Sequence, residues 1–239
     1  ASDKDVSDHF GQSCSMSGDT VVVGAHLDNP GGSDSGSAYV YVLSDGLWTE
    51  QAKLTASDKE ANDHFGYSCS ISGDTVVVGA DDENPGGINL AGSVYVYFRT
   101  GGIWTEQAKL TASDKEVIDY FGNSCSISGD TVVVGAYAED PSSLASAGSA
   151  YVYTRTGATW TEQAKLTASD KATTDYFGYS CSISGDTVVV GADFEDPGGI
   201  GNAGSVYVYT RSGATWAQQA KLTASDKATT DYFGYSCSI

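Results

Sequence analysis

One segment, Phe65-Gly66-Tyr67-Ser68-Cys69-Ser70-Ile71-Ser72-Gly73-Asp74-Thr75-Val76-Val77-Val78-Gly79-Ala80, is the clearest copy of a motif that recurs along this chain. Residues 67–72 alternate large and small side chains, which is typical of a strand with two unlike faces. Residues 75–78 are a β-branched run, which suits a strand buried on both faces. Residues 72–74 between them have tight-turn chemistry, because glycine adopts positive φ without a steric penalty. The segment therefore predicts a β-hairpin.

The motif returns at a nearly fixed interval, so the chain is a repeat array. The phenylalanine of its Phe-Gly pair recurs at spacings of 55, 56, 56 and 56 residues, at Phe10, Phe65, Phe121, Phe177 and Phe233. Such a period indicates stacked supersecondary units. We therefore expect one array over residues 1–239, with units 2–56, 57–112, 113–168 and 169–224 and a partial unit 225–239.

The rest of each unit predicts two more strands. Residues 37–42 of the first unit place tyrosines on one face and valines on the other, and a short turn leads to residues 47–55. In this last segment polar residues alternate with Trp48 and Ala52, as expected for a partly solvated outer strand. Tryptophan recurs there at Trp104, Trp160 and Trp216. The fold class is therefore all-β, with four antiparallel strands per unit, which is the sequence form of a propeller blade.

Composition limits the partners. The 239 residues include 12 Lys+Arg against 31 Asp+Glu, a formal charge of −19. We expect no nucleic-acid partner, because phosphates are bound by Lys and Arg that displace counterions. Attraction to an anionic membrane surface is disfavoured for the same reason. No apolar run approaches membrane-spanning length, so no membrane insertion is expected.

The five cysteines stand at the same phase of the repeat, one per unit, at Cys14, Cys69, Cys125, Cys181 and Cys237. This excludes a disulfide within a unit and a CxxC-type site. Two interpretations remain open, namely bridges between neighbouring units and buried thiols that act as small apolar residues. We favour buried thiols, because packed sheets lie roughly 10 Å apart and bridged Cα atoms lie within about 7 Å.

The recurring Phe-Gly, the hairpin that closes in Val-Gly-Ala and the later Gly-Ser-x-Tyr-Val-Tyr strand resemble the FG-GAP repeat. That repeat builds the β-propeller head of integrin α chains and of many microbial surface proteins. The resemblance covers essentially the whole chain. It implies four-stranded blades, an extracellular or cell-surface location and, often, calcium.

The sequence departs from this family in three ways. The proline of the family motif is replaced by His26, Asp81, Tyr137 and Asp193. The calcium loop between the first two strands is shortened to Ser-Gly-Asp, which argues against calcium there. Integrin-like heads close with about seven blades, whereas this chain carries four full periods. The array is therefore either part of a closed propeller or an open superhelical array of blades.

Two acidic features recur and are the weak candidates for calcium. The first is the pair of aspartates that flanks each Phe-Gly entry, namely Asp58 and Asp63, Asp114 and Asp119, Asp170 and Asp175. Two carboxylates underfill a calcium shell of six to eight oxygens, so bonds to backbone N–H groups in a turn are the simpler interpretation. The second is the loop between the second and third strands, whose acids vary between units as in a solvated loop. We expect no cofactor, with calcium as the one alternative.

Catalysis has little support in the sequence. None of the three histidines, His9, His26 and His64, recurs in every unit, so the serines have no repeated base to activate them. The cysteines stand in apolar strands, where a low-pKa thiolate is disfavoured. The paired tyrosines, such as Tyr95 and Tyr97, would form either a sugar-binding strip or interblade packing, and packing is simpler. We expect no enzyme.

The residues expected to build the repeated core are Phe65, Gly66, Cys69, Val76, Val78, Gly79, Trp104, Phe121, Cys125, Trp160, Phe177 and Cys181. Residues 225–239 restate the phase of residues 2–16, which favours either a fragment of a larger propeller or an array that continues from chain to chain. We therefore expect a structural protein that forms an extracellular fibre or surface assembly, with further copies of the same repeat as its partner. An integrin-like adhesion head for a glycan or protein ligand is the alternative.

Overall fold

Each copy of the motif forms the inner hairpin of a four-stranded sheet. In the second copy β5 (Cys69–Ser72) pairs antiparallel with β6 (Thr75–Ala80), and Gly73 in the turn between them has φ of 56°. The second strand is longer than the sequence predicts, because Gly79 and Ala80 continue the ladder opposite Val94 and Ser93. The first strand is shorter, because the backbone N–H of Tyr67 closes a turn onto the carbonyl of His64.

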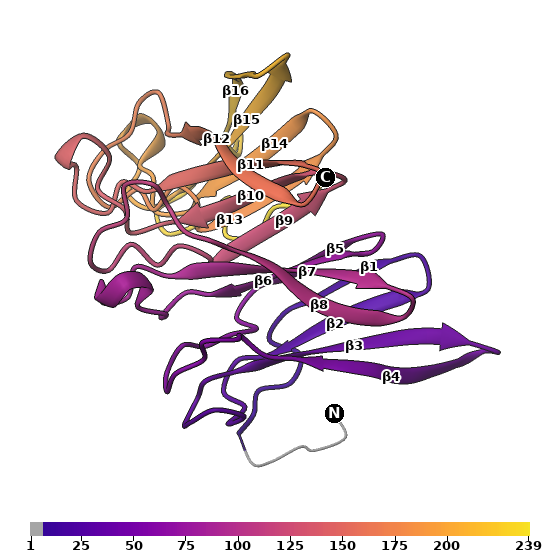
Figure 1. Ribbon diagram of the computed structural model, residues 1–239. Helices are drawn as coiled ribbons and strands as arrows, with labels where there is room; N and C mark the ends of the chain where they lie inside the picture. The colour runs from indigo at the N-terminus through magenta and orange to yellow at the C-terminus, as the bar shows by residue number, and fades with distance from the viewer. Residues whose placement is uncertain (1–6) are drawn as a thin grey trace.

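The computed structural model describes residues 7–239 and confirms the all-β fold class, with four sheets of four antiparallel strands in sequence order (Figure 1). We call these sheets blades. The first blade contains β1 (Cys14–Ser17), β2 (Thr20–Ala25), β3 (Ser37–Ser44) and β4 (Leu47–Leu54). The second adds to β5 and β6 the strands β7 (Ser93–Thr100) and β8 (Ile103–Leu110). The third contains β9 (Ser124–Ser128), β10 (Thr131–Ala136), β11 (Ser149–Thr156) and β12 (Thr159–Leu166). The fourth contains β13 (Ser180–Ser184), β14 (Thr187–Ala192), β15 (Ser205–Ser212) and β16 (Thr215–Leu222).

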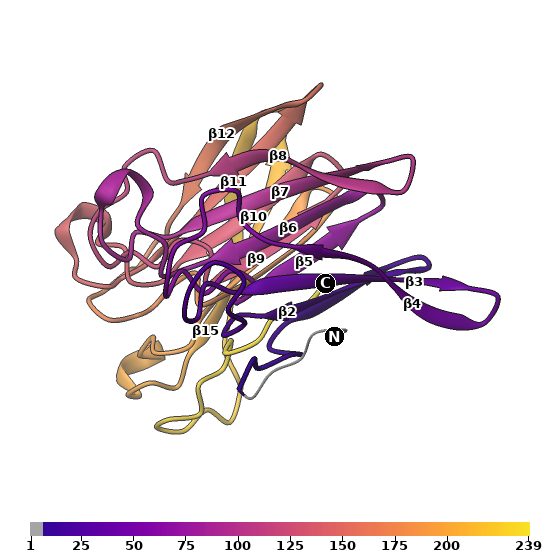
Figure 2. The ribbon, with the colours of Figure 1, turned by 60° about the horizontal axis from the view of Figure 1, so that its bottom comes forward.

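Helix is confined, within the described residues, to three short 3₁₀ turns, η1 (Pro85–Gly87), η2 (Pro141–Ser143) and η3 (Pro197–Gly199). Each lies in the loop between the second and third strands of its blade, and these loops lie on one side of the molecule (Figures 1 and 2). No helix in the part that the structure describes has the length and apolarity to cross a bilayer.

The blades pack face to face through two unlike surfaces. The front face of a blade carries the Phe-Gly phenylalanine, the cysteine, both tyrosines and the tryptophan, and the back face carries small aliphatic side chains. Between the second and third blades, Phe121, Tyr151 and Trp160 of the front face pack on Val77 and Val96 of the back face. The same arrangement joins the first blade to the second and the third to the fourth. The predicted tyrosine packing is therefore confirmed, and the tyrosines are not a surface strip.

Polar contacts fix the same interfaces. The first strands of neighbouring blades pack on one another, β5 on β9 for example. Ser68 Oγ donates a hydrogen bond to the carbonyl of Gly122 at 2.7 Å, and the N–H of Ile127 donates to Ser70 Oγ at 3.2 Å. At the outer edge Trp160 Nε1 donates to Gln107 Oε1 at 3.0 Å. Each blade therefore joins the next by a repeated set of bonds.

The cysteines of the second, third and fourth blades lie buried on the first strand, as the sequence predicts, and are free thiols. Ser13 Oγ, from the preceding blade, donates to Cys69 Sγ at 3.2 Å. Burial raises the pKa of the Cys69 thiol to about 12. These thiols therefore act as packing groups, as expected for a small apolar side chain. Cys14, on the front of the first blade, is exposed.

Candidate functional site

Two positions that differ between the units lie together at the loop side of the blades. One is the residue after Val-Gly-Ala, which is His26, Asp81, Tyr137 or Asp193. Another is the residue before Phe-Gly, which is His9, His64, Tyr120, Tyr176 or Tyr232. Side chains of the two positions contact one another. Tyr137 lies between Tyr120 and Tyr176, with ring centroids 5.3 and 5.4 Å apart.

Local geometry brings these positions together. The residue before Phe-Gly has a left-handed backbone in every copy, with φ of 57° at His64 and 55° at Tyr120. The chain then turns sharply into the first strand. The residue after Val-Gly-Ala leaves the second strand beside it, because the N–H of Glu83 turns back onto the carbonyl of Ala80. The side chains before Phe-Gly and after Val-Gly-Ala, which differ in chemistry between units, thus meet on a backbone that has the same conformation in each unit.

At the first interface this backbone holds a histidine cluster, which we define as His9, His26, His64, Asp81 and Asp82. The rings of His9 and His26 have centroids 5.3 Å apart, and those of His26 and His64 are 5.4 Å apart. His64 Nδ1 lies 2.9 Å from Asp82 Oδ2. Asp81 and His26 are buried, and in the described chain neither Asp81 Oδ1 nor His26 Nδ1 has a hydrogen-bond partner.

Burial and neighbouring charge shift the pKa values in this cluster. Burial, with the neighbouring His64 and His9, lowers the pKa of His26 to about 4. The hydrogen bond to Asp82 raises the pKa of His64 above its ordinary value. Burial and the adjacent Asp82 raise the pKa of Asp81 to about 7. His26 is therefore neutral at pH 7, and Asp81 is poised between its two forms.

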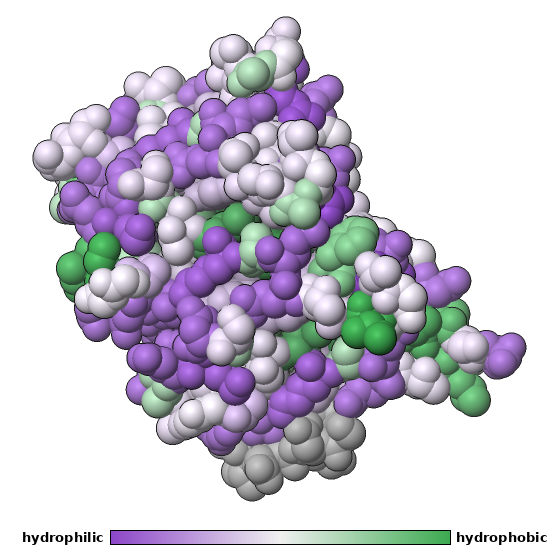
Figure 3. All heavy atoms as spheres, viewed as in Figure 1, coloured by the Kyte–Doolittle hydropathy of each residue, from purple (hydrophilic) through white to green (hydrophobic). Residues whose placement is uncertain are grey.

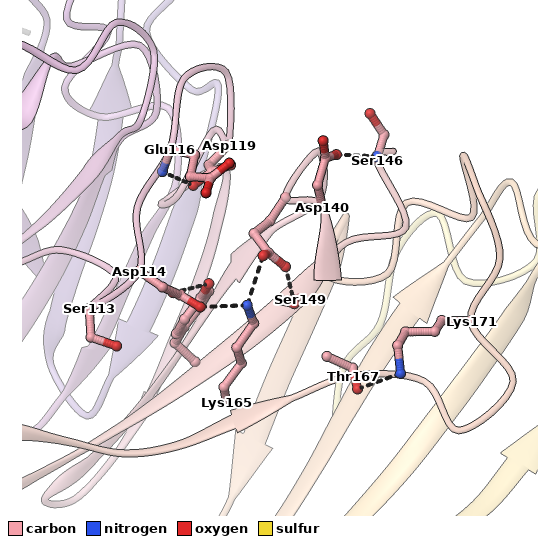
Figure 4. Close-up of polar contacts among 12 residues, drawn as sticks. Ser113, Asp114, Glu116, Asp119, Asp140, Ser146, Ser149, Lys165, Thr167 and Lys171 are labelled. Atoms are coloured by element: carbon pink, nitrogen blue, oxygen red, sulfur yellow. Dashed lines mark hydrogen bonds and ion pairs between the residues drawn. The ribbon is translucent and has the colours of Figure 1, made fainter. Parts of the chain in front are cut away.

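The acids of the loop between the second and third strands form a separate, repeated site around a lysine. In the third unit Lys165 Nζ lies 2.7 Å from Asp114 Oδ2 and 2.7 Å from Glu139 Oε1 (Figure 4). Ser149 Oγ donates to the other oxygen of Glu139, and Tyr151 donates its hydroxyl hydrogen to Asp114 at 2.8 Å. Equivalent clusters surround Lys109 and Lys221.

These lysine clusters correct one expectation from the sequence. The acids of this loop were expected to be solvated, but Glu83, Glu139 and Glu195 are buried, as are Asp81 and Asp193. The loop folds back so that its glutamate reaches the lysine of the fourth strand. An isolated buried carboxylate is costly, and the ammonium group offsets that cost.

The aspartate pairs proposed as calcium ligands have separate roles in the structure. The first aspartate of each pair binds the lysine and a tyrosine hydroxyl, at Asp58, Asp114 and Asp170. The second accepts a backbone N–H within a turn, at Asp63, Asp119 and Asp175. The turn interpretation is therefore confirmed for the second member. Calcium at these aspartates stays the alternative that the sequence left open. The lysine lies between the first aspartate and the loop glutamate, not between the two aspartates of a pair.

The second aspartate predicts a pH dependence. Burial, together with Glu139, Glu116 and Asp114, raises the pKa of Asp119 to about 6, although the Glu116 N–H opposes this. The folded pKa lies above the unfolded value, so the folded state binds more protons and the contribution of Asp119 to stability falls as pH rises from about 4 to 6. Asp119→Asn should remove this contribution, while those of Asp63 and Asp175 remain, and should raise the free energy of unfolding by about 1 kcal/mol at pH 7.5. Urea unfolding at a series of pH values measures it.

Asp114→Asn is the matched control. Burial raises the pKa of Asp114, but the hydrogen bonds from Lys165 and Tyr151 outweigh burial and lower it overall. This replacement should therefore destabilise at neutral pH. If both asparagine variants shift stability in the same direction, the assignment of opposite roles to the two aspartates is wrong.

The front face of the first blade is the second candidate site. Phe10 is 44% exposed and Trp48 47%, whereas Phe121 and Trp160 in the third blade are 0% and 9% exposed. Together with Val21, Val23 and Tyr41 they line a groove of about 440 Å³. Figure 3 shows hydrophobic atoms at the outer end of β3 and β4, where Leu47 is also exposed. This surface has the chemistry of a blade interface.

The sequence missed the histidine cluster. It noted Asp81 and Asp82 among the loop acids that were weak candidates for a metal, but it set the histidines aside because none recurs in every unit. The useful signal was variation between units rather than recurrence in every unit. Positions that vary between otherwise near-identical units mark residues that the fold does not require.

Comparison with known proteins agrees with the architecture. The FG-GAP repeat family profile matches residues 1–41, 48–97, 104–153, 160–209 and 216–239. A search of curated protein sequences gave no match. Among solved structures, Sqt1 of Saccharomyces cerevisiae, a β-propeller-like repeat protein, is similar with a TM-score of 0.52 and 13% identity. The similarity covers 92% of this chain and 50% of that one, so this chain spans about half the length of the similar structure.

At this identity the structural similarity bears on the fold alone. It agrees with the four sheets in sequence order and with the front-to-back packing of the blades. The family profile bears on the sequence, and it covers every unit that the Phe-Gly spacing defines. The chain belongs to the FG-GAP repeat family.

Proposed function

We propose that this chain is a non-enzymatic structural protein, a building block of an extracellular fibre or cell-surface assembly that forms by packing of blade on blade. FG-GAP repeats are typical of extracellular proteins. The observation that carries the proposal is the exposed front face of the first blade. It presents the same residue types that are buried at the three internal interfaces, with Phe10 and Trp48 at its centre.

The opposite end of the array offers the complementary surface. Residues 225–239 lie on the back face of the fourth blade, where the N–H of Ile239 donates to Ser182 Oγ as Ile183 does to Ser126 Oγ. They cover Val189 and Val206, but Leu222 stays 46% exposed, whereas the equivalent Leu166 is 4% exposed. The back face is thus covered only in part.

The occupant that fits the open front face is the back face of a second copy of this chain. The segment that begins at Phe10 has the same motif as the segment that begins at Phe233, so the first could replace the second on a fourth blade. Burial of a large side chain such as Phe10 or Trp48 is worth about 1.5–3 kcal/mol. Head-to-tail contacts of this kind generate open filaments or rings.

Sedimentation velocity and electron microscopy test this assembly. At about 0.15 M salt, which screens the −19 charge, the mass should rise between about 1 and 100 μM. A variant without residues 225–239 should associate more strongly, because its back face is free. Trp48→Glu should weaken association in both chains. Val117→Glu, at an exposed loop position, is the matched control and should leave association unchanged.

A chain that stays monomeric at all concentrations, with and without residues 225–239, contradicts the proposal. Association that Trp48→Glu leaves unchanged contradicts the assigned face. A compact monomeric disc would favour the alternative, an adhesion head for an extracellular glycan or protein ligand. The partly exposed tyrosines Tyr120, Tyr137 and Tyr176 favour that alternative, because stacked aromatic rings suit the apolar faces of sugars. Loss of glycan binding in Tyr137→Ala would support it.

A further inference from the structure

All three histidines of the chain lie in one place, although they come from three separate segments. His9 precedes the first Phe-Gly pair, His26 follows β2, and His64 precedes the second Phe-Gly pair. Asp81 and Asp82, directly after β6, complete the histidine cluster. The repeat does not require these residues, because the third unit has Tyr120, Tyr137 and Ala138 at the positions of His64, Asp81 and Asp82.

The donor atoms are close enough to share one ion. One ligand atom each from His64, Asp81 and Asp82 lie within 4.8 Å of one another. His64 Nδ1 and Asp82 Oδ2 are 2.9 Å apart. Two ligands bound to a tetrahedral zinc ion at about 2.0–2.1 Å are roughly 3.3 Å apart. A small side-chain adjustment would therefore admit the ion between them.

Unpaired buried atoms at the same place are a second, independent observation. Asp81 is 5% exposed, and its Oδ1 has no hydrogen-bond partner in residues 7–239. His26, whose ring lies against that of His64, is 8% exposed, and its Nδ1 is likewise unpaired within that range. A buried polar atom without a partner is costly, and each such case in a native structure calls for an explanation. A cation bound here would satisfy Asp81 directly.

We propose that His64, Asp81 and Asp82 bind one divalent transition-metal ion such as Zn²⁺. Imidazole and carboxylate together suit zinc and its neighbours in the first transition row. Calcium is the wrong ion for this site, because it takes oxygen ligands only. The site is separate from the shortened loop between the first and second strands and from the lysine clusters. All three proposed ligands belong to the second blade, and the His64 ring packs against His26 of the first blade.

The fourth blade provides an internal control. Asp193 occupies the position of Asp81 and is 1% exposed, and both its oxygens lack a partner in the described chain. Its neighbours in the motif are Tyr176 and Phe194, which replace His64 and Asp82. A buried aspartate is thus present at both positions, whereas the histidine and the second carboxylate are present only at the first.

Isothermal titration of the tag-free, chelator-treated chain with ZnCl₂ tests the site. The Cys14→Ser background removes the exposed thiol. We expect one equivalent of Zn²⁺ to bind. His64→Ala and Asp81→Asn should each weaken binding at least about 10–100-fold, the loss that outer-shell changes alone produce. Asp193→Asn should leave the affinity unchanged, and Ca²⁺ in excess should not compete.

Thermal unfolding separates a lost ligand from a lost fold. Zn²⁺ should raise the Tm of the parent chain, since a ligand that binds only the native state stabilises it. Asp81→Asn should abolish this rise while its metal-free Tm stays at or above that of the parent, because the amide keeps the shape and removes the buried charge. Absence of zinc binding, binding that both ligand variants retain, or an equal loss in Asp193→Asn would overturn the proposal.

Discussion

Alanine at Gly79 is expected to lower the free energy of unfolding by about 3 kcal/mol or more, although it adds a single methyl group. A Cβ at this position would lie 2.0 Å from the carbonyl oxygen of Gly122 and 2.4 Å from Ser68 Oγ. The first of these atoms is backbone of the next blade and has no side-chain rotation to move it away. The two blades must therefore separate locally, which also breaks the bond from Ser68 to Gly122. Urea unfolding followed by tryptophan fluorescence measures the loss.

Gly201→Ala is the matched control for this substitution. The nearest atom to its added Cβ is Thr229 Cγ2 at 3.8 Å, an ordinary contact. Its stability should stay within about 0.5 kcal/mol of the parent chain. Gly135→Ala, where the Cβ would lie 1.9 Å from the carbonyl oxygen of Gly178, should repeat the effect of Gly79→Ala at the next interface. If both interface variants unfold at the parent's urea midpoint, close backbone approach is not what the motif requires.

The sequence predicted the blade because the information for a blade is local. Alternation in residues 67–72, the β-branched run after them and the Ser-Gly-Asp turn specify a hairpin within about fifteen residues. Repetition at a fixed phase then specifies stacking. The same local information explains why the tryptophans were placed correctly on the fourth strand. The sequence did not show that Gly79 is needed for close backbone approach, because the carbonyl of Gly122 that it faces belongs to the following unit.

The sites were harder to predict because their members are distant in sequence. Lys165, Glu139 and Asp114 come from a strand, a loop and a linker. The variation of the loop acids between units therefore suggested a solvated loop where the structure has a buried cluster. The histidine cluster was missed for a related reason. Its three histidines belong to two units, and the second unit alone carries His64 together with Asp81 and Asp82, so the pattern does not repeat along the chain.

The repeated and the variable positions of the units lie in different parts of the array. The faces that join blades repeat almost without change, so any front face fits any back face. The loop-side positions instead vary from histidine and aspartate at one interface to tyrosine at the next. The proposed assembly therefore depends on what the units share, and the proposed metal binding depends on where they differ.

Lys165→Met is expected to lower the free energy of unfolding by about 2–4 kcal/mol, because it leaves two acids without their counter-charge. Glu139 is 7% exposed and would lose the ammonium group 2.7 Å away (Figure 4). Asp114 would lose its ion pair too, but that side chain is half exposed, so its share of the loss is small. Methionine keeps the length of the side chain, so packing along β12 is retained.

Acidification should narrow the difference between Lys165→Met and the parent chain. Although burial raises the pKa of Asp114, the bonds from Lys165 and Tyr151 lower it overall, below its ordinary value of 3.8. The stability that this pair contributes is present above that value and is lost as pH falls through the folded pKa. The part of the gap that comes from Asp114 should therefore be full at pH 7 and shrink below about pH 4, so the gap narrows modestly in acid. Urea unfolding at several pH values measures it.

Two further variants test whether the charge of Lys165 is responsible. Lys171→Met removes a lysine whose ammonium group makes one hydrogen bond in the described chain, a 3.5 Å contact with Thr167 Oγ1 (Figure 4). Its stability should change by less than about 0.5 kcal/mol. Adding Glu139→Gln to Lys165→Met removes the buried uncompensated charge and should restore part of the lost stability. A loss of equal size in Lys171→Met, or a gap that widens in acid, would show that the lysine does not balance these carboxylates.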